Sequence, residues 1–481
     1  MWLNTLLVIV ALAIGRAVWR VVSRFVLRSP LDDIPGPPSK SLVFGNFRQL
    51  FSPDAWAFHE QLARDYGSVV RTTGLFGEKQ LYVSDPKALH HIVAKDMDIY
   101  EEHPQYIATN TVVFGDGLLS SSGEKHRRQR KLMNPVFSAT HIRSMIPIFQ
   151  EVLGALLFQL CETLGTLTED GPREVDMLHW ISRTALELIG RSGLGYTFDS
   201  LKVDDAPHPY ATNIKELAVY KLGPAWFRRA VINALPMPNV HNLRDKIDFM
   251  WETSKEIYSQ KLEALRAGDA IVSKQIGQGK DILSLLIRAN MKADDPLDEA
   301  ELLAQMSSIA DARHARTLIF AAMDTTSSAL ARTVCLLVQH PDVQERLRSE
   351  IRKAKNEHGT LTYDELESLT YLDAVCRETL RLFPPIPQML RMTRQDTVLP
   401  FDRPVTGVDG KLVSEVHVPE GTPVVIGIMN ANRNSGIWGD DAMEWKPERW
   451  LKPLPDSVTD AHMPGIYSHL MTFLGGGRAC M

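Results

Sequence analysis

Apolar residues are concentrated at the N-terminus. Positions 2–15 are apolar except for Asn4 and Thr5, and arginines follow at positions 16, 20, 24 and 28. As a helix, residues 2–22 would reach about 32 Å, which spans a bilayer if the arginine side chains extend to the interface. Because the basic residues follow the apolar run, the pattern opposes a cleaved signal and favours an anchor over residues 1–28, with the main body cytoplasmic. An amphipathic helix lying in the interface is the alternative.

The hydrophobic pattern of the remaining chain is mostly helical. The sequence IPGPP at positions 34–38 predicts a stiff proline-rich hinge over residues 29–39. Residues 40–481 contain no Gly/Ser linker and no repeat, so we expect one large domain. Helical spacing predicts helices over 148–164, 180–191, 247–267 and 343–356. Short apolar runs predict strands over 68–72, 80–83, 415–418 and 422–426. The predicted fold class is therefore mainly α with small peripheral β-sheets.

Composition narrows the class of protein. Hydrophobic residues are 44 % and charged residues 23 % of the 481, which excludes a mostly disordered chain. A net charge of −5 gives no general attraction to nucleic acid. The 4 cysteines exclude a disulfide scaffold and show no CxxC metal spacing. Reduced thiols fit a cytosolic body. We interpret Cys161, Cys335 and Cys376 as small buried hydrophobic residues.

The C-terminal string surrounds the remaining cysteine with residues suited to a thiolate. It reads Phe473-Leu-Gly-Gly-Gly-Arg-Ala-Cys480-Met481. Consecutive glycines let backbone N–H groups approach the sulfur, and Arg478 adds a positive charge that lowers a thiol pKa. Phe473 can separate the sulfur from water. A string this constrained points to a metal-binding thiolate at Cys480.

At this string the sequence resembles the cytochrome P-450 haem-thiolate monooxygenases, most closely their membrane-anchored fungal-type members. The resemblance implies the cytochrome P-450 fold. It also implies that Cys480 is the axial ligand of the haem iron, where thiolate donation favours O–O cleavage. Arg478 is then a partner of a haem propionate, and Phe473 lies in the cofactor site.

Further family motifs occur in the expected order. Glu378-Thr-Leu-Arg381 matches Glu-x-x-Arg, with both charges on one helix face. Pro447-Glu-Arg449-Trp450 resembles Pro-x-Arg-Phe. The resemblance implies a structural network of Glu378, Arg381 and Arg449 behind the haem, in which an unpaired buried charge would be costly.

A segment inside a long apolar helix resembles the oxygen-activation motif. It reads AAMDTT over residues 321–326, with Ala322 where the family has Gly. Ala321 and Thr325 share a helix face, and we assign proton delivery to Asp324 and Thr325. The alternative is that the Thr325 hydroxyl bonds to a backbone carbonyl while Asp324 faces water.

A basic run, KHRRQRK over residues 125–131, resembles the family helix that carries Trp-x-x-x-Arg toward the haem. Its generic interpretations are a solvated helix face or a nucleic-acid patch. The resemblance places His126 and Arg130 at the haem propionates, together with Arg391, which follows a Pro-Pro-x-Pro turn. Bidentate arginine donors suit such carboxylates.

The sequence departs from the family pattern at two places. It stops one residue after Cys480, where family members continue into a helix and terminal strands, so we expect a C-terminally incomplete fold. Residues 308–316 look like an insertion. We interpret both features as a faulty gene model or an unusual splice form. A hydrated stretch of a long helix is the alternative for residues 308–316.

The resemblance implies insertion of one atom of O₂ into an apolar organic substrate. The implied cofactor is haem b, and electrons would come from NADPH through a membrane reductase. We expect the chain at the endoplasmic reticulum membrane, with no nucleic-acid partner. The alternatives are a haem-thiolate isomerase or dehydratase, against which Asp324 and Thr325 argue, and an inactive fragment unable to hold haem. Residues 106–119, 209–240 and 385–389 are the candidates for substrate selection.

Overall fold

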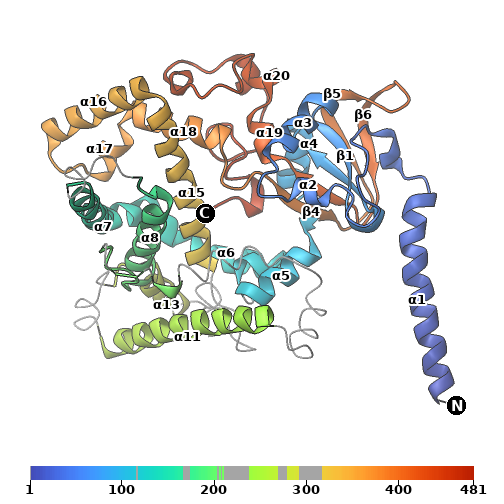
Figure 1. Ribbon diagram of the computed structural model, residues 1–481, viewed down its shortest axis with the longest axis horizontal. Helices are drawn as coiled ribbons and strands as arrows, with labels where there is room; N and C mark the ends of the chain where they lie inside the picture. Colours follow the sequence, from blue (N-terminus) through green and yellow to red (C-terminus); the bar gives the residue numbers. More distant parts are fainter. Residues whose placement is uncertain are drawn as a thin grey trace. The chain divides into compact units, whose positions relative to one another are not determined.

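The chain is divided into two compact units. The computed structural model describes residues 2–114, 117–165, 174–202, 205–206, 208–210, 238–268, 279–291 and 317–481 (Figure 1). The first unit comprises Met1–His103 and Leu380–Cys480, and the second comprises Pro104–Thr379 with Met481. The described residues are mainly helical with small sheets, so the predicted fold class is confirmed. The predicted insertion at 308–316 lies outside the described residues.

The first unit is built on a five-stranded sheet of order β1-β2-β7-β4-β3. Its strands are β1 (Val69–Thr73), β2 (Lys79–Val83), β3 (Tyr100–Glu102), β4 (Met389–Thr393) and β7 (Pro423–Ile426). Only the β2–β7 pair is parallel, and the other neighbours are antiparallel. A two-stranded sheet pairs β5 (Thr397–Thr406) with β6 (Leu412–Val418). The predicted strands correspond to β1, β2, β6 and β7, whereas β3, β4 and β5 were not predicted.

Apolar central strands explain how this sheet is buried. Leu81 and Val83 of β2 and Val424 and Ile426 of β7 are all 0 % exposed, because helices and loops cover the sheet on both sides. The helical segments of this unit are α2 (Phe47–Leu50), α3 (Trp56–Tyr66), η2 (Leu75–Gly77), α4 (Pro86–His90), η3 (His91–Lys95), α19 (Ile428–Asn432), α20 (Ser435–Trp438), η7 (Pro447–Leu451), α21 (Asp456–Thr459) and η8 (Gly476–Arg478).

The N-terminal segment forms one helix, α1 (Trp2–Val26) (Figure 1). Several of its large apolar side chains are exposed, among them Leu12, Trp19 and Val26. Its end contacts the β1–β2 hairpin, where the Arg24 guanidinium lies 3.0 Å from a Glu78 carboxylate oxygen. Exposed apolar side chains along a helix are typical of a membrane-associated segment.

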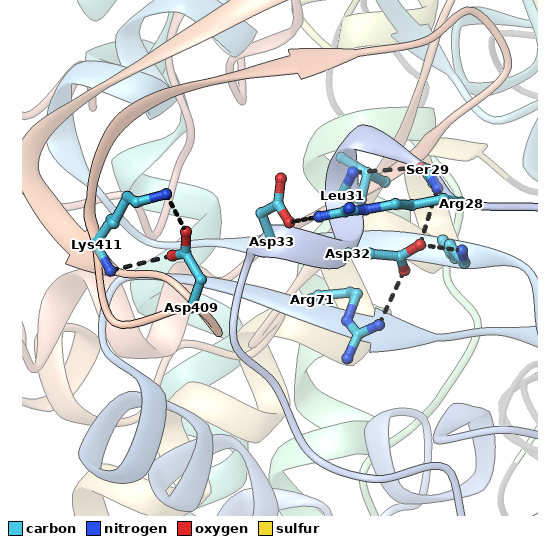
Figure 2. A network of polar contacts seen from close by, with 9 residues as sticks. Arg28, Ser29, Leu31, Asp32, Asp33, Arg71, Asp409 and Lys411 are labelled. Carbon is cyan, nitrogen blue, oxygen red and sulfur yellow. Dashed lines mark hydrogen bonds and ion pairs between the residues drawn. The ribbon is translucent and has the colours of Figure 1, made fainter.

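The segment after α1 is fixed to the sheet by a polar network (Figure 2). Within η1 (Pro30–Asp33), one Asp32 carboxylate oxygen accepts from Arg71 at 3.1 Å and the other accepts from Lys79 at 2.6 Å. Partial burial raises the pKa of Asp32, but hydrogen bonds from Lys79 and the Ser29 amide outweigh it and hold that pKa below its usual value. The hinge is therefore attached to β1 and β2.

The hinge also pairs with the sheet through its backbone. The Arg71 amide donates to the Pro35 carbonyl at 2.9 Å. A Cβ on Gly36 would lie 1.8 Å from the Arg71 carbonyl oxygen, so the prolines need a glycine between them at this close approach.

The second unit is helical in its described part. Its helices are α5 (Pro104–Phe114), η4 (Leu118–Ser120), α6 (Gly123–Met133), η5 (Asn134–Phe137), α7 (Ala139–Gly165), α8 (Met177–Ile189), η6 (Gly190–Leu194), α11 (Pro238–Ala267), α13 (Ile282–Met291), α15 (Thr317–Gln339), α16 (Pro341–His358), α17 (Tyr363–Glu367) and α18 (Thr370–Leu382), whose last residues belong to the first unit. The four predicted helices correspond to α7, α8, α11 and α16. α15 packs along α8 (Figure 1), and Pro341 begins α16 at a position where its missing N–H costs nothing.

Two buried ion pairs stabilise the core of the second unit. Arg183 of α8 lies 2.6 Å from Asp199, and Lys261 of α11 lies 3.0 Å from Asp281. Asp281 also accepts hydrogen bonds from the amide and hydroxyl of Ser284. Such pairs tolerate burial because their charges are matched and hydrogen-bonded.

Among the described residues, one helix is long and apolar enough to cross a membrane by length and composition. It is Ala139–Cys161 within α7, whereas many side chains of the predicted N-terminal anchor lie outside the described residues that this finding covers. Val152 and Leu156 of this helix are buried against Trp180, and the Gln150 amide donates to the Leu361 carbonyl. One face of this helix is therefore packed within the second unit, whereas Leu153, Leu157 and Phe158 are exposed.

The interpretation of the other cysteines was wrong. Cys161, Cys335 and Cys376 are all exposed rather than buried. Each lies on a helix, and helical spacing alone does not reveal which face of an apolar helix turns outward.

Candidate functional site

The predicted thiolate ligand lies at the end of a short closed loop. The Cys480 amide donates to the Phe473 carbonyl at 2.9 Å, and the Ala479 amide donates to the Gly476 carbonyl at 3.2 Å across η8. The Phe473 ring packs edge-on against Tyr467, with ring centroids 5.4 Å apart. Cys480 itself is exposed. The loop therefore presents the sulfur while its backbone is held by internal hydrogen bonds.

Two glycines of this loop are required by close backbone packing. A Cβ on Gly475 would lie 1.8 Å from the Pro464 carbonyl oxygen, and one on Gly476 would lie 1.7 Å from that of Val93. Gly476 also has a φ of +67°, which disfavours any other residue. The glycine run was predicted to admit N–H groups toward sulfur. In the structure it also seats the loop against η3.

The arginines of two predicted motifs bind backbone carbonyls around one tryptophan. Arg381 is 0 % exposed and donates to the carbonyls of Asn432 at 3.2 Å, Ala442 at 2.7 Å and Glu444 at 3.2 Å. Its guanidinium lies 5.0 Å from the Trp438 ring centroid. A cation with three carbonyl acceptors can remain charged at this depth.

Arg449 lies on the same tryptophan. It donates to the Trp438 carbonyl at 3.3 Å and to an Asp441 carboxylate oxygen at 2.8 Å. This hydrogen bond holds the pKa of Asp441 below its usual value. Glu378, the third member of the predicted network, is buried on α18. The structure thus brings Arg381 and Arg449 to one ring, while the three-residue network stays a prediction.

The two arginines of the first unit that are predicted at the haem propionates each contact a glutamate. Arg391 of β4 lies 2.8 Å from a Glu102 carboxylate oxygen, and Arg478 of η8 lies 3.1 Å from a Glu101 carboxylate oxygen. Arg478 also lies 4.0 Å from Glu102. Sequence reasoning missed both glutamates, because strand β3, which places them beside β4, was not predicted.

The second unit holds the predicted proton-delivery residues on α15. The Thr325 hydroxyl donates to the Ala321 carbonyl at 2.6 Å, which is the backbone contact considered as the alternative. Asp324 is half-buried. The hydrogen of the Thr325 hydroxyl is used in this bond to the backbone, so the hydroxyl oxygen can accept a further hydrogen bond.

The remaining predicted cofactor residues lie on α6. His126 is buried and Arg130 is half-buried one turn later on the same helix. Gln129, also buried, accepts from the Ser121 hydroxyl at 2.9 Å. The other basic residues alternate with these, and Arg127 and Lys131 are exposed. The basic run is therefore an amphipathic helix with a polar inner face.

The donor set around Cys480 suits a cofactor that needs one protein ligand. No group of three or more His, Cys, Asp or Glu side chains in the described part of the chain is placed to hold a metal ion. An exposed thiol on a glycine loop, with Arg391 and Arg478 in the same unit, fits haem iron and its carboxylates better than a tetrahedral metal site.

Comparison with known proteins identifies the family. The family model for cytochrome P450 matches residues 35–481. The chain belongs to the cytochrome P450 family. It is 47 % identical over 479 residues to cytochrome P450 monooxygenase 91 of Postia placenta, covering 96 % of this chain and 86 % of that protein. It is 40 % identical over 498 residues to ganoderic acid synthetase CYP5150L8 of Ganoderma lucidum, covering 99 % and 88 %.

Membership of the cytochrome P450 family accounts for the C-terminal loop. The matched region includes Cys480 and the other quoted motifs. Cytochromes P450 bind haem and receive electrons from a redox partner. The relatives carry monooxygenase names, which agrees with the reaction class implied by the sequence.

Proposed function

We propose that this cytochrome P450 is a haem-dependent monooxygenase that takes electrons from NADPH through a reductase. The observation that carries the proposal is the exposed thiol of Cys480 on its closed glycine loop. A thiolate there would be the one protein ligand that a P450 iron requires. The proposed cofactor is haem b.

The chain's own residues would hold that cofactor through charge and shape. Cys480 would bind the iron, and Phe473 would limit access of water to the sulfur. The cationic groups proposed for the propionates are His126, Arg130, Arg391 and Arg478. When bound, haem supplies the iron at which O₂ is split, one oxygen atom entering the substrate and the other leaving as water.

Asp324 and Thr325 are proposed to move the proton that oxygen cleavage consumes. The Thr325 hydroxyl donates to Ala321, so its oxygen can accept a hydrogen bond from water or from the reacting oxygen. Asp324, one residue earlier and half-buried, is the nearest acid along the helix. In this assignment Asp324 supplies the proton and Thr325 orients its acceptor.

The variant Asp324→Asn is expected to lower product formation by about 10²-fold, because it removes the acid while keeping the side-chain shape. The reduced carbon monoxide spectrum should not change. Product formed per NADPH consumed is the measurement, and Ser328→Ala, an exposed position on α15, is the matched control. Equal coupling in Asp324→Asn and wild type would remove Asp324 from the relay.

The proposed substrate is apolar and the proposed location is the endoplasmic reticulum membrane. The exposed apolar residues of α1 support an anchor over residues 1–28, the proline-rich residues 29–39 form the hinge and residues 40–481 the catalytic domain. Ile386, within the predicted substrate segment 385–389, is 42 % exposed. Most of the second candidate segment, 211–237, and the side chain of Phe320 lie outside the described residues.

The test is the reduced carbon monoxide difference spectrum of the full chain, expressed with haem supply. A thiolate-type red-shifted band followed by reductase-dependent oxygenation is the expected result. Turnover without a reductase would instead support a haem-thiolate isomerase or dehydratase. No haem band would contradict the proposed function and would identify the chain as inactive.

A further inference from the structure

The arginines predicted to bind haem propionates already have carboxylate partners within their own unit. We propose that Glu101 and Glu102 act as internal counter-anions, which hold Arg391 and Arg478 in ion pairs until the carboxylates of a porphyrin take their place. The inference rests on the proposed haem function, because porphyrin propionates are the competing carboxylates.

Strand pairing places the first ion pair. β3 runs antiparallel to β4, with Glu102 directly opposite Arg391 and Glu101 opposite Met392. Side chains that face each other across two strands are about 5 Å apart at Cβ, so a Glu–Arg pair closes without distortion. The Arg391 and Glu102 side chains are only 4 % and 5 % exposed. Their attraction is therefore little screened by water.

The C-terminal loop brings the second arginine to the same acids. Arg478 contacts Glu101 at 3.1 Å and Glu102 at 4.0 Å, with 18 % of its own side chain exposed. Glu102 thus lies between two guanidinium groups. Two arginines and two glutamates together carry no net charge, so the cluster is electrically balanced before any cofactor carboxylate arrives.

The two carboxylate oxygens of Glu102 differ in their hydrogen bonding. Its Oε1 faces both arginines, whereas Oε2 has no hydrogen-bond partner in the part of the chain that the structure describes. A buried carboxylate with a vacant oxygen is less stable than a fully bonded one. Glu102 is therefore a strong partner for Arg391 in electrostatic terms but an incompletely satisfied one, as expected of an acid that is to be exchanged.

The charged surroundings of Glu102 agree with this picture. Burial holds the pKa of Glu102 above its usual value, because it outweighs the lowering by Arg391 and Arg478, and Glu101 adds to the rise. Glu102 is thus an incompletely stabilised carboxylate. Arg394 donates to the Glu102 backbone carbonyl at 3.1 Å. The adjacent His103 has its pKa lowered to about 4 by burial and by Arg394, so it is neutral at pH 7 and adds no charge.

If porphyrin propionates replace Glu102 at Arg391, removing the Glu102 charge should have opposite effects on the stability of the chain and on porphyrin binding. Without a porphyrin, Arg391 loses its partner and the buried cation destabilises the chain. With a porphyrin, the propionates no longer compete with Glu102, so they bind more tightly. A residue that merely positioned the arginines for the propionates would weaken porphyrin binding when removed.

The experiment compares the full chain with Glu102→Gln, which keeps the side-chain shape. The haem-free Glu102→Gln chain should unfold at a temperature about 5 °C lower than wild type. Metal-free protoporphyrin IX, followed by fluorescence, should bind Glu102→Gln about tenfold more tightly than wild type, equivalent to ~1.4 kcal/mol. The dimethyl ester of protoporphyrin IX, which lacks the carboxylates, should bind both chains equally.

One control variant and one substitute variant accompany Glu102→Gln. Glu415→Gln, an exposed position on β6, should change neither measurement. If Glu102→Gln does not fold, Glu101→Gln tests the same exchange at Arg478, with about a threefold gain expected at this more exposed pair. The proposed exchange would be overturned if the glutamine variants bound protoporphyrin IX more weakly than wild type. It would also be overturned if the dimethyl ester gained as much affinity as the free acid.

The iron-free probe separates this inference from the proposed function. A missing carbon monoxide band with the expected porphyrin affinities would reject the haem-thiolate function and leave the exchange standing. A normal carbon monoxide band, with the same protoporphyrin IX affinity in Glu102→Gln and wild type, would support the haem-thiolate function and reject the exchange of Glu102 for propionates.

Discussion

Replacing Cys480 with histidine is expected to abolish the thiolate-type red-shifted band of the reduced carbon monoxide complex and to reduce reductase-supported oxygenation to background. An imidazole can still bind iron, but it does not donate electron density as a thiolate does, so O–O cleavage loses its main assistance. The structure supports this choice of position, because Cys480 is exposed at the end of a loop closed by its own amide bond to Phe473.

The control for Cys480→His is another exposed cysteine. Cys161→Ser, on α7, should keep both the band and the activity. Thermal unfolding of the haem-free chains should not distinguish Cys480→His from wild type, because the side chain is exposed. A red-shifted band retained in Cys480→His would show that another residue binds the iron.

Two of the four strands found from sequence share a simple property. β2 and β7 are short apolar runs, and full burial on both faces explains their composition. β5 was missed because it contains Pro400 and Pro404, which are tolerated there since its sheet has only two strands and both are edges. β3 was missed because three residues carry no periodicity, and two of them are acidic.

The candidate site was predictable where local chemistry decided it. The residues from Phe473 to Cys480 adjoin in sequence, so their residue types could be interpreted together. The close approach of Gly475 to Pro464 and of Gly476 to Val93 was not visible in that stretch. Glu102 illustrates the opposite case. Adjacent acids ordinarily indicate a hydrated surface, and only the pairing of β3 with β4 buries Glu102 against Arg391. Contacts between residues far apart in sequence leave no local pattern to detect.

The role of the Thr325 hydroxyl was left open by the sequence for a different reason. Sequence allowed either a catalytic hydroxyl or one bonded to the backbone, and the structure shows the bond to Ala321. The two interpretations are compatible, because a hydroxyl that donates to a carbonyl still has acceptor lone pairs. The bond to Ala321 is thus compatible with the proposed role of Thr325 as an acceptor, and the proposed proton source remains Asp324.

Replacing Arg381 with lysine is expected to destabilise the haem-free chain by about 3–5 kcal/mol. Arg381 is 0 % exposed and serves the carbonyls of Asn432, Ala442 and Glu444, while its plane lies over Trp438. A lysine ammonium has no planar fork, so it cannot reach all three acceptors and leaves buried carbonyls unsatisfied. Urea denaturation followed by circular dichroism measures the loss.

Arg403→Lys is the matched control for Arg381→Lys, because Arg403 is exposed and also donates to a backbone carbonyl, that of Gly436, at 3.1 Å. Its expected cost is about 0.5 kcal/mol or less, since water replaces the lost hydrogen bond. The comparison separates the burial of a cation from its bond to a carbonyl. If Arg381→Lys unfolded like wild type without haem and lost only haem affinity, Arg381 would act on the cofactor and not on the fold. The three carbonyl bonds favour the fold, because they use the guanidinium's donors within the chain itself.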